Sequence, residues 1–90
     1  YNPNYEFGGK VLQSDNGKNV IEIKNRLNVG DTLELIIPEE LEPIKFTINK
    51  LWDYETDEKI DHVNPGKEGQ KVKMILPEEA KDGMILRRKK

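Results

Sequence analysis

The sequence has no cysteine and only one alanine among its 90 residues. Without cysteine, the chain holds no disulfide, no thiol nucleophile and no thiolate-ligated iron–sulfur cluster. Small secreted domains usually carry disulfides, so we expect a cytoplasmic protein. No apolar run approaches the ~20 residues that a membrane-spanning helix needs, so we expect no membrane partner.

A charge excess of one sign is also lacking. Lysine and arginine number 15, aspartate and glutamate number 17, and both signs are interspersed along the chain. The net charge of −2 gives no overall attraction to nucleic acid or to an anionic membrane. The residues that are abundant favour strands over helices, because threonine, valine and isoleucine together number 17. Seven glycines and five prolines interrupt the chain at short intervals, as is typical of small β domains.

Alternation of apolar and polar residues predicts short strands, with Leu35 and Met74 among the residues that face the core. The turn "DNGK" at residues 15–18 predicts a hairpin, because Asn-Gly readily takes positive φ. Near Lys50 the alternation of apolar and polar residues shifts by one position, which indicates a β-bulge. Residues 78–83 fit a single helical turn. The expected strands cover residues 7–14, 20–24, 32–37, 44–49, 59–63, 72–76 and 84–88.

The chain repeats itself after 39 residues. Residues 5–40 align with residues 44–79 without a gap, and nine of the 36 aligned positions are identical. The matches fall on expected core positions and turn residues, as a structural repeat requires. We therefore predict two related three-stranded units that pack face to face into a small closed antiparallel β-barrel of six or seven short strands. The glutamate pairs that follow Pro38 and Pro77 are interpreted as solvated loop residues.

No residue pattern predicts catalysis or a cofactor. Ser14, His62 and Asp61 supply the residue types of a hydrolytic triad, but no G-x-S-x-G turn surrounds Ser14. Asp61 and His62 are adjacent, so they point to opposite faces of a strand. Asp53 and Asp57, together with Asp61, lack the glycine and the terminal glutamate of a calcium loop. We therefore expect no catalytic residue, no metal site and no cofactor.

Basic and aromatic residues are the best candidates for a binding surface. Lys45, Lys71 and Lys73 share the outward-facing parity of their strands. Trp52 and Tyr54 offer rings on which a base can stack. The alternative, which the slightly negative net charge favours, is that Trp52 packs in the core or caps a barrel mouth and that the lysines only confer solubility.

Arg26 is a further candidate binding residue. A buried guanidinium at this position would need a carboxylate partner, which Asp31 or Glu34 would supply. The rarity of buried arginine favours the other interpretation, a surface residue that stabilises a turn.

The segment "NRLNVGDTLELIIP" at residues 25–38, with "YEFGGKVL" near the start and "GMILRRKK" at the end, resembles the C-terminal domain of the collagenase-like peptidase family U-32. Leu27 departs from the pattern, because the family has an aromatic residue there. The resemblance covers roughly residues 5–88. The matching residues are Asn25, Arg26, Gly30, Asp31, Glu34 and Pro38, and the repeat adds Gly69 and Pro77 as the counterparts of Gly30 and Pro38.

The resemblance implies a β-barrel appended to a larger upstream domain, similar to the barrels of translation elongation factors and to the closed meander of lipocalins. Members of the family are described as proteases, some of them linked to collagen breakdown, and others are tied to hydroxylation of transfer or ribosomal RNA. The family's catalytic residues lie upstream, so none is carried over to this chain. We accordingly expect a linker at residues 1–4, a single domain at residues 5–88 and a basic tail at residues 89–90.

Three functions are therefore open. The first is a non-catalytic accessory domain that assists substrate recognition or positioning, with an upstream catalytic domain and a protein or peptide substrate as its partners. The second is an RNA-binding barrel of a protein that hydroxylates transfer or ribosomal RNA. The third is a structural or dimerisation module.

Overall fold

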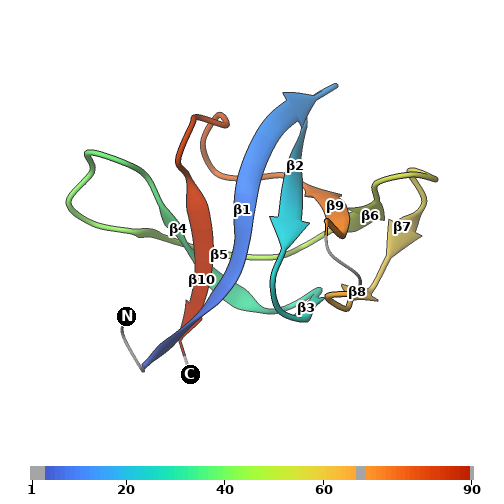
Figure 1. Cartoon of the computed structure of the whole chain (residues 1–90), viewed down its shortest axis with the longest axis horizontal. Coiled ribbons are helices and arrows are strands. Elements are labelled where there is room, and N and C mark those ends of the chain that lie inside the picture. Colours follow the sequence, from blue (N-terminus) through green and yellow to red (C-terminus); the bar gives the residue numbers. More distant parts are fainter. Residues whose placement is uncertain (1–3, 67–68, 90) are drawn as a thin grey trace.

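The computed structural model describes residues 4–66 and 69–89. In these ranges the chain forms ten strands and no helix (Figure 1). This part of the chain therefore offers no helix with the length and apolarity to cross a membrane. The strands are β1 (Tyr5–Asp15), β2 (Lys18–Ile23), β3 (Leu27–Asn28), β4 (Thr32–Ile36), β5 (Ile44–Thr47), β6 (Leu51–Asp53), β7 (Lys59–Ile60), β8 (His62–Val63), β9 (Lys71–Met74) and β10 (Ile85–Lys89).

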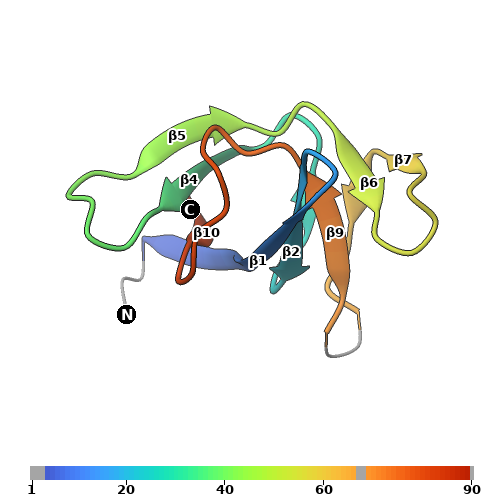
Figure 2. The same ribbon diagram turned by 90° about the horizontal axis from the view of Figure 1, so that it is seen from above.

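Eight of these strands form one antiparallel sheet in the order β5-β4-β10-β1-β2-β9-β6-β7, and β3 pairs with β8 in a separate two-stranded ladder. The sheet curls into an open half-barrel, which Figure 2 shows from above. The prediction of an all-β fold is confirmed. The prediction of a closed barrel of six or seven strands is wrong, because β5 and β7 end the sheet without pairing with each other.

The barrel stays open because the strand predicted at residues 44–49 is interrupted. β5 ends at Thr47 on one edge of the sheet, whereas β6 begins at Leu51 beside the other edge. Between them, the Ile48 N–H donates to the Asp31 carbonyl at 2.9 Å and not to a strand at the far edge. The irregularity expected near Lys50 is thus a break between two strands, not a bulge within one.

The inner face of the sheet carries the hydrophobic core. Leu35 and Met74, which alternation placed inward, are 0% and 1% exposed. Burial of each such side chain contributes about 1.5–3 kcal/mol relative to leaving it in water. The core consists of Val11, Ile21, Ile23, Leu27, Leu33, Leu35, Ile37, Ile48, Leu51, Val63, Val72, Met74, Leu76, Met84 and Leu86.

The internal repeat is visible in two hairpins and two turns. Ile21 pairs with β1, and its counterpart Ile60 pairs with β6, so each unit contains a comparable hairpin. Gly30 and Gly69 are also counterparts, and both have positive φ, at 97° and 86°, a conformation that favours glycine. The two units nevertheless share one continuous sheet and are not the separate three-stranded sheets that we predicted.

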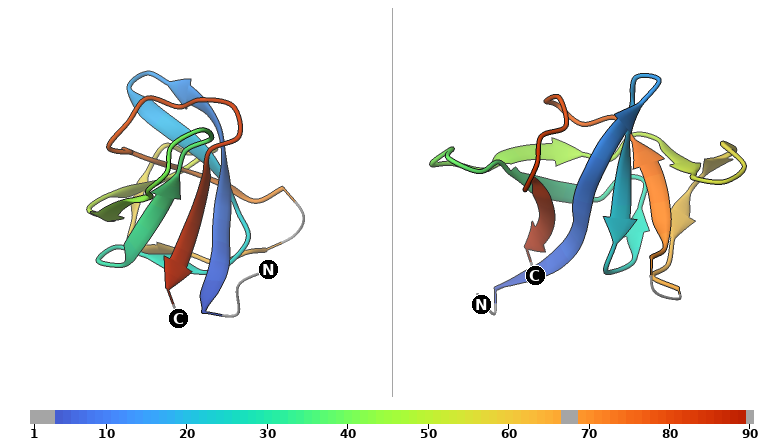
Figure 3. Two further views of the ribbon diagram at one scale, coloured as in Figure 1. Left: turned by 90° about the vertical axis from the view of Figure 1, so that its left-hand side faces the viewer. Right: turned by 45° about the horizontal axis from the view of Figure 1, so that its top comes forward.

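The first strand of the chain is longer than predicted, and the last one lies one residue further along the chain than predicted. β1 begins at Tyr5 and β10 ends at Lys89, and these two residues pair. Lys89 therefore belongs to the sheet and not to a basic tail. The start of β1 and the end of β10 therefore lie at the same end of the sheet (Figure 3). Residues 1–3, expected to be linker, and Lys90, expected in the tail, lie outside the described residues.

Two local predictions had different outcomes. The hairpin turn at residues 15–18 is confirmed, with Asn16 at φ 51° and Gly17 at φ 82°. The single helical turn at residues 78–83 is wrong, because this segment is an irregular connection between β9 and β10. A single helical turn has little stability of its own, because it fixes the backbone of several residues for one or two hydrogen bonds.

Candidate functional site

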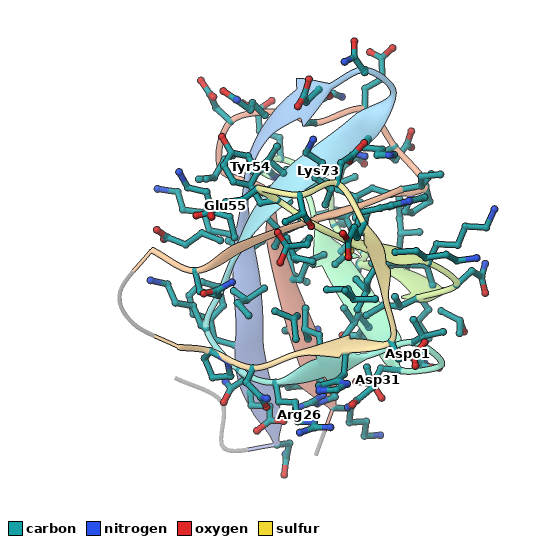
Figure 4. All side chains as sticks on the ribbon, turned by 90° about the vertical axis from the view of Figure 1, so that its right-hand side faces the viewer. Arg26, Asp31, Tyr54, Glu55, Asp61 and Lys73 are labelled. Carbon is teal, nitrogen blue, oxygen red and sulfur yellow. The ribbon has the colours of Figure 1, made fainter. Side chains whose placement is uncertain are left out.

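Half-buried side chains from three neighbouring strands gather on the outer face of the sheet. β9 contributes two lysines and lies between β2, which supplies Lys18, and β6, which supplies Trp52; Tyr54 directly follows β6. Figure 4 shows Tyr54 and Lys73 close together. We call this group the lysine–aromatic surface; it comprises Lys18, Trp52, Tyr54, Lys71 and Lys73.

Each lysine of this surface lies near the face of an aromatic ring. Lys18 Nζ is 4.3 Å from the centroid of the Trp52 ring. Lys71 Nζ and Lys73 Nζ are 5.1 and 5.8 Å from the centroid of the Tyr54 ring. A cation within about 6 Å of a ring is attracted by the ring quadrupole. A ligand that stacks on these rings would therefore have to displace the protein's own lysines.

Two aspartates bind the lysines of the surface. Asp57 accepts hydrogen bonds from Lys18 Nζ at 3.2 Å and from Lys73 Nζ at 3.4 Å, and Lys73 Nζ also lies 3.1 Å from Asp15 Oδ2. Hydrogen bonds from Lys18 and then Lys73 lower the pKa of Asp57. The hydrogen bond to Asp15 is the main cause that raises the pKa of Lys73. Asp57 and Lys73 therefore stay charged at neutral pH, and the two aspartates partly neutralise Lys18 and Lys73.

Trp52 belongs to a small apolar layer outside the main core. In register, Val20, Lys73 and Trp52 follow one another across β2, β9 and β6. Val20 is only 1% exposed although it lies on the outer face with these two neighbours. Trp52 therefore packs on the outer face of the sheet, neither in the core nor at a barrel mouth, and the interpretation that placed it there is wrong.

A pocket of about 260 Å³ adjoins the surface. It contains one lysine and two carboxylates, so it presents both signs of charge. The backbone N–H groups of Thr56 and Glu55 donate to Asp53 Oδ1 and lower the pKa of Asp53, which stays anionic at neutral pH. The lining residues are Asp53, Tyr54, Glu55, Gly69, Gln70 and Lys71.

The structure brings together four of the six predicted binding residues and separates two from them. Lys45 lies on β5, at the far edge of the sheet from β6, and Arg26 lies before β3. Lys18 was missed by sequence reasoning. The sequence feature that could have identified Lys18 is its position at the start of β2, four residues before Glu22 and therefore on the same outward face.

Arg26 is exposed, and Figure 4 shows it well separated from Tyr54 and Lys73. Its guanidinium donates to the side-chain oxygens of Asn28 and Asn64, at 3.1 Å each. The interpretation of a buried guanidinium is therefore wrong, and Arg26 holds the position of a surface arginine beside a turn.

Asp31 pairs instead with an arginine of β10. Arg88 donates to Asp31 Oδ2 at 2.9 Å, to the Arg26 carbonyl at 2.8 Å, and through Nε to Glu6 Oε1 at 2.8 Å. Arg88 shares the parity of the buried Leu86, so its guanidinium lies at the end of the half-barrel interior. One forked side chain thus connects β1, β10 and the turn before β4.

Glu34 pairs with Arg87, which precedes Arg88 in β10 and points to the opposite, outer face of the sheet. Arg87 Nε donates to Glu34 Oε1 at 2.7 Å, and the guanidinium carbon lies 3.8 Å from the centroid of the Tyr5 ring. Glu34 is only 7% exposed beneath this contact. We call this second group the arginine end; it comprises Glu6, Asp31, Glu34, Arg87 and Arg88.

The other residues of the sequence motif lie at turns and strand ends. Asn25 Nδ2 donates to the Phe7 carbonyl at 2.6 Å, which ties the end of β2 to β1. Pro38 follows β4 and Pro77 follows β9, as the repeat predicts. A Cβ at Gly83 would lie 2.8 Å from Pro38 Cγ, so the crossing to β10 passes close to this proline.

The residue types of a hydrolytic triad are not brought together. Ser14 donates to Asn19 Oδ1 at 3.2 Å in the β1–β2 hairpin, whereas His62 pairs with Asn28 in the separate β3–β8 ladder. Across residues 4–66 and 69–89, no group of three or more histidine and carboxylate side chains is placed to hold a metal ion.

A family model described as the peptidase family U32 C-terminal domain matches residues 3–87. The chain belongs to this family. The resemblance seen at residues 25–38 is thereby confirmed. In this U32 C-terminal domain, Asp31 and Glu34 of the motif belong to the arginine end, and no residue of the lysine–aromatic surface belongs to the motif.

Two crystal structures are similar to this U32 C-terminal domain, and both are of the C-terminal domain of a "putative U32 peptidase" from Geobacillus thermoleovorans. One, of the selenomethionine variant, is 28% identical with a TM-score of 0.76 and covers 92% of this chain and 99% of that chain. The other is 29% identical with a TM-score of 0.71 and covers 94% of this chain and 92% of that chain. No curated protein matches the chain.

Proposed function

We propose that this domain is a non-catalytic accessory domain of a U32 peptidase and that it binds polypeptide substrate for a catalytic domain elsewhere in the protein. The observation that carries the proposal is the lysine–aromatic surface. It gathers two rings, three lysines and a pocket on one face of the sheet. Aromatic rings with polar edges and cations with nearby carboxylates suit the mixed chemistry of a polypeptide.

The charge distribution favours polypeptide over a polyanion. Asp15 and Asp57 pair with the lysines, and Asp53 and Glu55 line the adjoining pocket. A nucleic acid backbone would be repelled by these carboxylates, whereas a peptide can offer partners of both signs. The surface is therefore better suited to peptide groups than to a row of phosphates.

The single tryptophan provides a direct test of substrate binding. Trp52 lies within the surface, so gelatin or a collagen-like peptide that binds there will change its fluorescence. We expect Tyr54→Ala and Lys71→Ala to weaken this binding at least about tenfold, because each removes half of one ring–cation pair and part of the pocket wall. Lys10→Ala, an exposed lysine of β1 outside the surface, is the matched control.

In an enzyme that carries both domains, the same substitutions should raise KM for a large substrate and leave kcat unchanged. A drop in kcat with KM unchanged, or proteolysis by the isolated 90-residue domain, would contradict an accessory role in binding.

RNA binding is the second candidate, because three lysines and two aromatic rings on one surface also match the elements of a single-strand RNA site. Titration of transfer RNA with Trp52 fluorescence as the signal distinguishes the two. RNA binding should weaken steeply between low and high salt, because phosphate contacts release counterions. Peptide binding should depend on salt only weakly.

A further inference from the structure

One edge of the sheet is incompletely covered. β5 (Ile44–Thr47) pairs with β4 on one side, and no strand of the described chain pairs with it on the other. The inward side chains of β5, Ile44 and Phe46, remain half-buried. Their register partners on β4, Leu35 and Leu33, are 0% exposed. A further strand beside β5 would cover what the half-barrel leaves open.

The hydrogen-bond pattern shows which backbone groups face this edge. The Ile48 N–H donates to the Asp31 carbonyl at 2.9 Å, which continues the register of the β4–β5 ladder. Because N–H groups two residues apart in a strand point the same way, the Phe46 N–H also faces β4. The N–H groups of Lys45 and Thr47 therefore face the open edge, and in the described chain no backbone bond outside the ladder reaches them.

The side chains beside the edge define its chemistry. Lys45 and Lys50 are exposed, and neither forms an ion pair with any described carboxylate. A hollow of about 200 Å³ lies at the C-terminal end of β5, and Ile75 in it is 59% exposed. The hollow is lined by Thr47, Asn49, Lys50 and Ile75.

We propose that the β5 edge binds an extended acidic segment of another polypeptide by strand addition. The segment's backbone bonds to Lys45 and Thr47, its alternate apolar side chains pack beside Ile44 and Phe46, and its acidic side chains lie beside Lys45. A second copy of this chain fits poorly, because lysine on an edge strand opposes edge-to-edge pairing of like strands. The site is separate from the lysine–aromatic surface and stands whether or not that surface binds substrate.

Amide hydrogen exchange of the 90-residue domain tests the geometry first. In the free domain, the amide of Phe46 should be protected and the amides of Lys45 and Thr47 should exchange freely. A short blocked peptide of alternating glutamate and valine should protect the Lys45 and Thr47 amides when it binds. A peptide of alternating lysine and valine should bind at least about tenfold more weakly.

Two variants separate strand addition from other modes of binding. Thr47→Pro removes an edge-facing N–H and leaves the β4 ladder intact, so it should abolish binding of the glutamate–valine peptide. Thr47→Val keeps that N–H and is the matched control, which should bind as the parent does. Lys45→Glu should reverse the preference between the two peptides, and it keeps the proposal testable if the proline variant does not fold.

Several results would overturn the proposal. They are free Lys45 and Thr47 amides that are already protected, no binding of the glutamate–valine peptide at millimolar concentration, and binding that survives Thr47→Pro in a folded protein. A dimer in light scattering that Thr47→Pro dissociates would assign the edge to a second copy of the chain instead. Substitutions at Tyr54 and Lys71 test only substrate binding by the lysine–aromatic surface. Failure of that proposal can therefore be distinguished from failure of strand addition at the β5 edge.

Discussion

The arginine end and the lysine–aromatic surface are built from the same kinds of groups, yet they differ in the geometry of their contacts and in the exposure of their carboxylates. In each cluster, cations pair with carboxylates and a cation lies over an aromatic ring, which for Arg87 is the ring of Tyr5. In the arginine end, Arg88 bonds to Glu6 and Asp31, which lie far apart in the sequence, and Glu34 beside it is nearly buried. In the lysine–aromatic surface, Lys73 also joins distant segments, because its ammonium meets both Asp15 and Asp57, but the side chains of these two aspartates are 41% and 55% exposed.

The difference follows from the shapes of the two cations. A guanidinium is planar and donates in fixed directions, so it holds each of its partners in a defined geometry, whereas an ammonium is a compact point charge on a flexible stem. The family motif accordingly falls on the arginine end, which holds the fold together. The lysine–aromatic surface lies outside the motif and keeps groups that can exchange partners. We therefore assign stabilisation of the fold to the arginine end and keep the proposed binding role for the lysine–aromatic surface.

Loss of Arg88 should have the largest effect on stability. Arg88→Ala leaves Glu6 and Asp31 without their shared partner and frees the Arg26 carbonyl, so we expect a loss of about 2 kcal/mol and about 10 °C in Tm. Arg88→Lys should recover less than half of the loss, because an ammonium cannot make the forked contacts. Urea unfolding measures both, and a change within about 0.5 kcal/mol for Arg88→Ala would remove the distinction between the two clusters.

Arg87 should follow, with a loss of about 1 kcal/mol for Arg87→Ala, because Glu34 stays nearly buried and loses its hydrogen-bonded partner. The added change Glu34→Gln removes the stranded charge and should restore part of the stability. Thermal unfolding of the two single variants and the double variant gives the coupling. Strictly additive losses would show that this pair does not interact across β4 and β10.

Lys73→Ala should cost less than either arginine substitution, and its effect should depend on pH. The lowered pKa of Asp57 means that its contribution is present above the unfolded pKa, near 3.9, and is lost as pH falls through the folded value. The raised pKa of Lys73 means that its contribution is present below about 10.4 and is lost as pH rises through the folded value. The difference in free energy of unfolding between Lys73→Ala and the parent should thus be constant near neutral pH and vanish at both extremes of pH. Urea unfolding across pH will measure it.

Salt should produce the smallest effect and should act on one cluster more than on the other. At about 1 M salt, where the Debye length is about 3 Å, exposed pairs are screened and partly buried pairs much less so. The stability difference caused by Lys73→Ala should therefore shrink, while that caused by Arg88→Ala persists. Equal shrinkage of both differences would mean that the arginine end is as open to solvent as the lysine–aromatic surface.

Much of the fold follows from local patterns in the sequence. Alternation places Leu35 and Met74 in the core, and Asn16-Gly17 specifies the first hairpin. The open edge of the half-barrel could not be predicted from local patterns. It depends on which strands β5 and β6 pair with on either side of the break at residues 48–50. The two-residue strands β3 and β8 are also too short for a periodic signal.

The candidate site was predictable in its residue types and less so in its contacts. Parity placed Lys71 and Lys73 on the outer face, and the rings of Trp52 and Tyr54 join them there. Arg88 could not be matched to Asp31 from sequence, because the two are 57 residues apart and meet only through the β10–β4 pairing. Because of the same long-range pairing, Asp31 and Glu34, the expected partners of Arg26, bind Arg88 and Arg87 instead.

The adjacency of Tyr5 and Lys89 has a mechanical consequence. A force that pulls Tyr5 away from Lys89 separates β1 from β10 one residue pair at a time, like a zipper. It does not shear all the hydrogen bonds of the ladder at once. The next residue pair is Glu6 with Arg88, where the forked ion pair also grips the turn before β4. Tension on the domain would therefore be resisted first at the Glu6–Arg88 pair, and its rupture would let β1 and β10, two interior strands of the sheet, separate.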